Sequence, residues 1–129
     1  MEFTAYQKLC RLAGADQLHV NGLNGKFYEG NDSVVRSIKA CTTPLFEGYR
    51  SMPVVSSGQW AGTAVDTYKA AKTVDVMHLA GGGILGHPDG PAAGFESMKL
   101  GWEAAVQGYS IEEYGEKHSV LKKAIEKFS

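Results

Sequence analysis

The apolar positions of this chain follow two periods that alternate along the sequence. Near the N-terminus they recur every three or four residues, as on one face of a helix, at Phe3, Tyr6, Leu9, Cys10 and Ala13. Gly14 follows at the position of a C-terminal glycine cap. Three short apolar runs predict buried strands: "DQLHVNG" at 16–22, "MPVVSSGQ" at 52–59 and "TVDVMHLA" at 73–80.

Helical spacing returns after each of these runs. "DSVVRSIKAC", with Asp32 or Ser33 as N-cap, predicts a helix that ends before Pro44. Two further helices are marked by Ala61–Tyr68 and Phe95–Val106, and a last amphipathic helix carries Leu121, Ile125 and Phe128. Ser110 and Glu113 have the spacing of a capping box.

Strands that alternate with helices predict an α/β fold with a parallel sheet and right-handed crossovers. We interpret residues 1–129 as a single unit, with a leading helix, three strand–helix units and a terminal helix. Such a unit could be a small open sheet that pairs with a partner, or the C-terminal piece of a (β/α)₈ barrel, which needs about 250 residues. The barrel accounts better for a leading helix that no strand precedes.

Composition excludes several classes of function. The chain is 43% hydrophobic and 21% charged, with a formal net charge of −1, so nothing favours binding to nucleic acid or to an anionic membrane. Its apolar runs are shorter than the roughly 18 residues of a membrane span, and the N-terminus does not resemble a signal peptide. Cys10 and Cys41 stand alone, as expected for reduced thiols in a cytoplasmic protein.

Candidate chemistry lies in the three loops that follow the predicted strands, where parallel α/β proteins place their functional groups. In the third loop, Gly81, Gly82 and Gly83 could direct backbone N–H groups at an anion such as phosphate, or could simply allow close packing. The second loop, "SSGQW", offers Ser57, Gly58 and Gln59 beside it. Together the two loops favour a phosphate site.

The first loop contributes His19 at the strand end and Lys26 between flexible glycines. A lysine on such a loop can close over a ligand and stabilise developing negative charge, although a solvated surface lysine is the common alternative. His19 could equally be a hydrogen-bonded buried histidine. Of the other histidines, we expect His78 to pack in its strand and His87 to fix the shape of its loop.

Three segments of the chain resemble the RuBisCO large subunit and the RuBisCO-like proteins: "RLAGADQLHVNGLNGKFYEG", "VVSSGQWAG" and "HLAGGGILGHPDGPAAG". The resemblance runs from about residue 6 to residue 108 and implies strands 6, 7 and 8 of a (β/α)₈ barrel. Asn24 and Gln59 depart from the carboxylase pattern, so the chain is more similar to RuBisCO-like proteins than to the CO₂-fixing enzymes.

The resemblance also implies roles for individual residues. His19 matches an active-site histidine, and Lys26 matches the lysine of a mobile loop that closes over the substrate. Ser57 and Gly58 match substrate-contacting positions, and Gly81 and Gly82 match a backbone cradle for one phosphate. Gln59 stands where carboxylases have a further phosphate-binding glycine, so that contact is expected to differ.

The resemblance finally implies Mg²⁺-assisted enolisation of a phosphorylated sugar or sugar acid in a homo-oligomeric enzyme. The family's carbamylated lysine and acidic Mg²⁺ ligands belong to an earlier strand, so we expect no metal ligands here and an inert isolated chain. Depending on the subgroup, the resemblance implies decarboxylase, isomerase, enolase or carboxylase chemistry, and a decarboxylase or isomerase of sugar-acid phosphates is favoured. The alternatives are a non-catalytic phosphate-binding module and a module that self-associates through its sheet edges.

Overall fold

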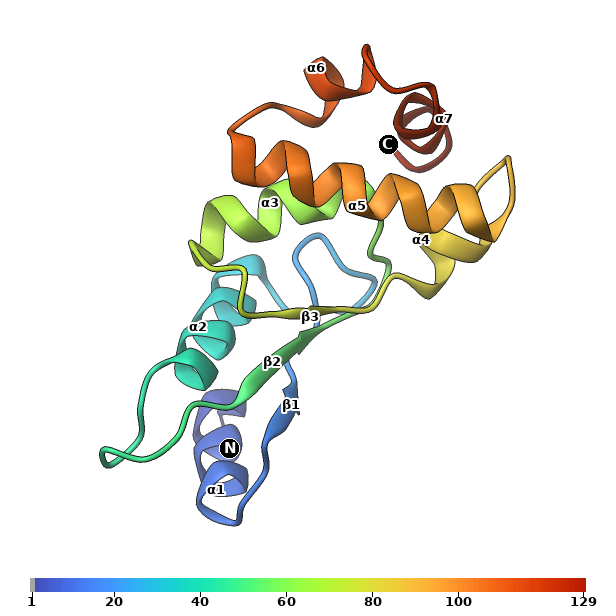
Figure 1. Ribbon diagram of the computed structural model, residues 1–129. Helices are drawn as coiled ribbons and strands as arrows, with labels where there is room; N and C mark the ends of the chain where they lie inside the picture. The colour runs from blue at the N-terminus through green and yellow to red at the C-terminus, as the bar shows by residue number, and fades with distance from the viewer. Residues whose placement is uncertain (1) are drawn as a thin grey trace.

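The computed structural model describes residues 2–129, which form a three-stranded parallel sheet flanked by helices (Figure 1). The strands are β1 (Gln17–His19), β2 (Met52–Val55) and β3 (Met77–His78), in the order β1-β2-β3. Residues His19 and Val54 are paired between the first two strands, and Val54 and Met77 between the last two. The predicted α/β fold with parallel strands is therefore confirmed, with strands shorter than the apolar runs.

Each strand leads into a helix, as the spacing predicts. The helices are α1 (Phe3–Leu12), α2 (Asn31–Thr42), α3 (Ala61–Ala71), α4 (Gly81–Leu85), α5 (Pro91–Gln107), α6 (Ile111–Gly115) and α7 (Ser119–Phe128). Gly14 ends the first helical segment with φ +96°, which a glycine adopts without strain. The Ser110–Glu113 capping box is also present.

Helix α2 begins earlier than its sequence predicts. Gly30, and neither Asp32 nor Ser33, occupies the N-cap position, and the Ser33 hydroxyl donates to Glu29 Oε1 at 2.6 Å. Glu29 also accepts from Asn21 Nδ2 at 2.6 Å. The side chain predicted to cap the helix instead ties the helix to the base of the loop after β1.

The glycine-rich segment after β3 is helical at its start, where we expected only a loop. Ala80 is the N-cap of the five-residue helix α4, and Ile84 N–H donates to Ala80 O at 2.8 Å. The terminal helix is likewise divided into α6 and α7. Propensity misses α4 because glycine disfavours helices, whereas the tertiary contacts of α4 with α5 offset that cost.

Two apolar clusters form the core. One joins α3, α5, α6 and α7, and the parallel packing of α3 and α5 is evident in Figure 1. The other joins β1, β2 and α2 and includes Val20, Val34, Ile38 and Val55, all fully buried. The loops after the strands lie where these two clusters meet.

The sheet is covered on one face only, although the apolar runs predicted strands buried on both faces. Leu18, Pro53 and Val55 alternate toward the helices, whereas Gln17, His19 and Met52 are exposed. Met77, 37% exposed, and Leu79, 45% exposed, extend this open face across β3. The helices of the described residues lie on the opposite side (Figure 1), and on the open face only Val54, at the centre of the sheet, is buried among the strand residues that the structure describes.

Candidate functional site

The loops that follow the three strands meet around one cavity of about 400 Å³. Six of the predicted site residues line it, and they are Lys26, Ser57, Gly58, Gln59, Gly81 and Gly82. Parallel strands place their carboxyl ends at one edge of the sheet, which brings together positions far apart in the sequence. Ser56, Trp60, Leu79, Gly83 and Phe128 complete the lining.

The first two loops pack backbone against backbone through glycines. A Cβ atom at Gly25 would lie 2.9 Å from Gly22 O and 3.0 Å from Ser57 O, closer than real contacts allow. A Cβ atom at Gly58 would lie 3.0 Å from Cγ of Lys26. The aliphatic stem of Lys26 therefore passes directly over the Ser57–Gly58 turn.

The Ser57–Gly58 turn has an unusual backbone conformation. Both residues have positive φ, +74° at Ser57 and +72° at Gly58. Glycine adopts this region freely, but a serine there costs free energy that the surrounding contacts must supply. Such strain is concentrated at functional positions, and here it accompanies a hydroxyl beside the cavity.

His19 does not line the cavity but is connected to it by hydroxyl groups. Its Nε2 lies 2.5 Å from Oγ of Ser56, and that oxygen lies 3.4 Å from Oγ of Ser57. The imidazole sits at the end of β1 on the open face of the sheet. His19 can therefore influence the serine hydroxyls and also remains accessible from outside.

The three glycines that open α4 have different surroundings. A Cβ atom at Gly83 would lie 2.6 Å from Gln59 O and 2.8 Å from Cα of Trp60, so close packing requires this glycine. Cβ atoms at Gly81 and Gly82 would meet no atom of residues 2–129 within 4 Å. Packing explains Gly83 alone, and Gly81 and Gly82 leave their backbone open to the cavity.

The side chain of Gln59 makes its hydrogen bonds inside the protein. Its side chain is buried, and its Nε2 donates to Leu23 O at 3.1 Å and to Ser57 O at 3.0 Å. Its Oε1 lies 3.2 Å from Nε2 of His78. The Gln59 side chain thus joins the segments that follow β1 and β2 to β3 itself, and Gln59 also lines the cavity.

His78 is the most perturbed titratable group of the described residues. Burial lowers its pKa from 6.5 to about 4, because the charged form loses its hydration. Trp102 Nε1–H donates to His78 Nδ1 at 3.1 Å, with the two rings in a T-shaped arrangement 5.6 Å apart. His78 is therefore neutral at neutral pH, and it does more than fill space in its strand.

His87 fixes the shape of the segment after α4, as predicted. Its ring is buried, its Nε2 donates to Val120 O at 3.0 Å, and its Nδ1 accepts from Asp89 N–H at 3.1 Å. These bonds fasten the segment to α7.

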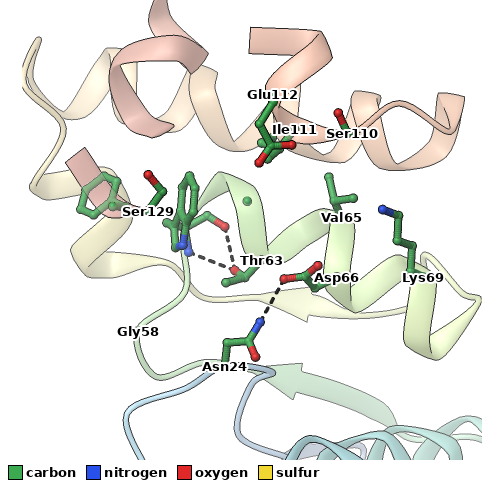
Figure 2. Close-up of a pocket in the computed structure, with 13 residues that line it drawn as sticks. Asn24, Gly58, Thr63, Val65, Asp66, Lys69, Ser110, Ile111, Glu112 and Ser129 are labelled. Carbon is green, nitrogen blue, oxygen red and sulfur yellow. Dashed lines mark hydrogen bonds between the residues drawn. The ribbon is translucent and has the colours of Figure 1, made fainter. Parts of the chain in front are cut away.

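A second cavity, of about 470 Å³, lies between α3 and the C-terminal segments (Figure 2). Figure 2 shows Asn24 reaching from the first loop to Asp66 of α3, with Nδ2 3.0 Å from Oδ2. Gly58, Trp60 and Phe128 line both cavities. No sequence pattern predicted this Asn24–Asp66 contact, because the two residues lie 42 positions apart and Asp66 belongs to no motif identified above.

Within residues 2–129, no three or more His, Cys, Asp or Glu side chains gather closely enough to hold a metal ion. None of the helices in this part of the chain has the length and apolar character needed to cross a membrane.

Comparison with known proteins identifies the family. Residues 1–128 match the family model for the ribulose bisphosphate carboxylase large chain, catalytic domain. The chain belongs to the RuBisCO large-chain family. A rubisco-like protein from Burkholderia fungorum superposes with a TM-score of 0.92 at 43% identity, over 97% of this chain and 31% of that one. The dimeric archaeal Rubisco from Hyperthermus butylicus gives a TM-score of 0.80 at 30% identity, over 95% of this chain and 31% of that one.

Curated relatives in this family are named as enzymes. The chain is 45% identical to the 3-oxo-isoapionate-4-phosphate decarboxylase of Rhizobium etli, over 100% of this chain and 31% of the relative. It is 44% identical to the 3-oxo-isoapionate-4-phosphate transcarboxylase/hydrolase of Xanthobacter autotrophicus, over 96% of this chain and 30% of the relative. The ribulose bisphosphate carboxylase of Pyrococcus furiosus is 34% identical, over 96% and 29%. The chain thus spans about a third of its relatives' length and is more similar to the RuBisCO-like proteins.

Proposed function

We propose that this chain carries the phosphate-binding end of a RuBisCO-like active site that acts on a phosphorylated sugar acid. The observation that carries the proposal is the cavity that collects Lys26, Ser57, Gly58, Gly81 and Gly82 from three loops. Each of these residues offers a cation, a hydroxyl or an open stretch of backbone. An anionic group of phosphate size fits that combination of donors.

The phosphate would bind against Gly81 and Gly82. Their N–H groups precede the first intrahelical bond of α4 and have no acceptor among residues 2–129. Because no side chain separates these groups from the cavity, phosphate oxygens can approach within hydrogen-bond distance. The Ser57 hydroxyl completes this set, and the Lys26 ammonium, which lines the same cavity, is left to act at the reacting end of the substrate.

Decarboxylation of a 3-oxo sugar-acid phosphate is the reaction that best suits this site. Breaking the bond to the carboxylate releases CO₂ and moves the electron pair to the ketone oxygen, which becomes an enolate. The Lys26 cation can stabilise that developing negative charge, and protonation at carbon then gives the product ketone. Relatives named for 3-oxo-isoapionate-4-phosphate favour this substrate class.

Mg²⁺ is proposed for the whole protein only. The described residues do not fit a metal site, because their His, Cys, Asp and Glu side chains form no group of three or more. We propose that the Mg²⁺ ligands lie outside residues 1–129. The isolated chain is accordingly proposed to bind phosphate without turnover.

The whole protein is proposed to be a cytoplasmic enzyme. We also propose that it is a homo-oligomer, since related Rubiscos are named as dimeric or octameric.

Self-association is the alternative that a specific observation favours. The open face of the sheet exposes Met52, Met77 and Leu79, which in an isolated chain could pair with a second copy. Light scattering at micromolar concentration tests this alternative, and a clean monomer would count against it.

A segment exchange tests the proposed function. Residues 1–129 replace the matching third of the R. etli decarboxylase, to which they are 45% identical. We expect the chimera to release CO₂ from 3-oxo-isoapionate-4-phosphate and to lose this activity when Gly82 is replaced by valine. A folded chimera that binds the substrate and releases no CO₂ would assign this segment to another reaction.

A further inference from the structure

A series of hydrogen bonds connects α5 to the loop that carries Lys26, and the donor and acceptor of each bond can be assigned. It begins at Trp102, whose Nε1–H can only donate, so His78 Nδ1 at 3.1 Å must accept. A neutral imidazole carries its single proton on the other nitrogen. His78 is consequently the Nε2–H tautomer and donates from that atom.

The His78 tautomer fixes the orientation of the Gln59 amide. His78 Nε2–H faces the Gln59 amide at 3.2 Å and, farther away, Thr63 Oγ1 at 3.5 Å, so the nearer atom is assigned as the acceptor Gln59 Oε1. The Nε2 of Gln59 then faces two backbone oxygens, Leu23 O at 3.1 Å and Ser57 O at 3.0 Å. Both N–H groups of the amide are used, and a flipped amide would oppose oxygen to oxygen at both sites.

Two glycines show that the first loop is built around this amide. A Cβ atom at Gly22 would lie 2.3 Å from Nε2 and 2.4 Å from Cδ of Gln59, so the side chain occupies the space beside that glycine. Gly25 packs on Ser57 O from the other side. The loop is thereby held against the Ser57–Gly58 turn, with Lys26 three residues beyond Leu23.

We propose that Gln59 is a positioning residue, oriented by His78 and Trp102, which holds the Lys26 loop against the Ser57–Gly58 turn. Gln59 acts through Lys26 and Ser57, because its buried amide is already hydrogen-bonded to Leu23 O, Ser57 O and His78 Nε2. The importance of this positioning for turnover rests on the proposed function. The geometry of the loop itself is independent of any ligand.

The test measures amide hydrogen exchange and NMR spectra of the 129-residue chain without any ligand. In Gln59→Glu, a carboxylate of the same size cannot donate to Leu23 O or Ser57 O. We expect exchange across residues 22–30 to rise at least tenfold relative to the unsubstituted chain. Ser97→Ala is the matched control, because Ser97 is equally buried and its hydroxyl bonds only to Gly94 O within α5.

A second variant changes a residue that is remote from the loop, and its readout is the tautomer of His78. General destabilisation of the fold would not change that tautomer. Trp102→Phe keeps an aromatic ring beside His78 but removes the Nε1–H donor. We expect the ring nitrogens of His78 to show a mixture of tautomers in long-range ¹H–¹⁵N spectra, and exchange in residues 22–30 to rise several-fold. Trp102 does not line the cavity, so this effect must travel through His78 and Gln59.

The two proposals fail in different ways. The positioning role would be overturned if hydrogen exchange in residues 22–30 of both variants stayed at the level of Ser97→Ala. It would also be overturned if His78 in the unsubstituted chain were not the Nε2–H tautomer. If Gln59→Glu does not fold, the Trp102→Phe data decide the question alone. A loop that loosens as expected, in a chain that does not bind inorganic phosphate, would support the positioning role and refute the proposed function.

Discussion

The three consecutive glycines at the start of α4 differ in what surrounds them. Gly83 touches the backbone of Gln59 and Trp60, whereas Gly81 and Gly82 face open space in the cavity. Glycine in a helix costs about 1 kcal/mol relative to alanine, so its use where no neighbour requires it points to close approach by a ligand. The sequence alone left packing and anion binding as equal alternatives for this triplet.

Substitution of these glycines separates packing from binding. Gly82→Val should abolish phosphate binding while leaving the free energy of unfolding within about 1 kcal/mol of the original value, because the new side chain fills the cavity and not the core. Gly83→Ala should lower the free energy of unfolding by about 1–3 kcal/mol, because its Cβ overlaps backbone atoms. Urea unfolding and phosphate titration of both variants provide the check. Unchanged phosphate affinity in Gly82→Val would contradict the assignment.

His78 makes stability depend on pH. The imidazole titrates near 6.5 in the unfolded chain and at about 4 in the folded one, so between these values the unfolded state binds more protons. The free energy of unfolding should therefore fall by about 3 kcal/mol from this group as the pH decreases from 6.5 to 4, with no loss above 6.5. Lys99 and Glu103 of α5 are the other titratable residues that line a surface groove together with His78.

Urea unfolding of the original chain and of His78→Phe across pH 4–7 measures this contribution. The phenylalanine variant keeps a ring next to Trp102 but cannot titrate. The difference in free energy of unfolding between the two proteins should change with pH in this range. A difference that stays constant would exclude His78 as the source.

The loop between β1 and α2 is anchored at its ends and open at its tip. Asn21 and Ser33 hold Glu29, Asn24 contacts Asp66, and Gln59 holds Leu23. Phe27 and Tyr28, next to Lys26, are exposed. This arrangement suits a lysine that moves over a bound ligand while the base of its loop stays in place.

Lys26→Ala tests that function in the R. etli chimera. Loss of the cation should lower kcat about 10²-fold or more while the KM for substrate changes little, because we propose that Gly81 and Gly82, and not Lys26, hold the phosphate. Steady-state CO₂ release gives both constants. Equal losses in substrate binding and turnover would instead assign Lys26 to general attraction of the anionic substrate.

Sequence patterns predict the elements of this fold better than their ends. Periodicity located the helices and the parallel strands, and the glycine clusters after the strands located the cavity that is the candidate site. The patterns missed α4, because its tertiary contacts override glycine's low helix propensity, and they placed the α2 cap at Asp32 or Ser33 because Glu29 was not recognised as the partner of Ser33. The Gln59–His78–Trp102 chain joins residues up to 43 positions apart, which only the folded structure brings together.

At the scale of the whole molecule, two observations point to the same larger fold. They are the open face of the sheet and the greater length of the relatives. The chain spans 31% of the R. etli relative, and one face of its three strands is uncovered in the described residues. A (β/α)₈ barrel would bury that face in its interior. The cavity at the ends of the strands is thus interpreted as one wall of a larger active site.

Magnesium titration tests the placement of the metal ligands. Isothermal titration of the 129-residue chain with Mg²⁺ should show no saturable heat at micromolar to low-millimolar concentration, because the described residues form no cluster of ligands. The same titration of the R. etli chimera should reveal a specific site. A tight, stoichiometric Mg²⁺ site in the isolated chain would contradict our placement.

The central claim is that the cavity binds phosphate through Gly81, Gly82 and Ser57, with Lys26 beside them, and NMR titration of the chain with inorganic phosphate tests it most directly. The account predicts saturable shifts of the Gly81 and Gly82 amides, with smaller shifts at Ser57 and Lys26 and none in α1. Phosphate that leaves these amides unchanged at saturating concentration, or shifts them no more than the amides of α1, would contradict it.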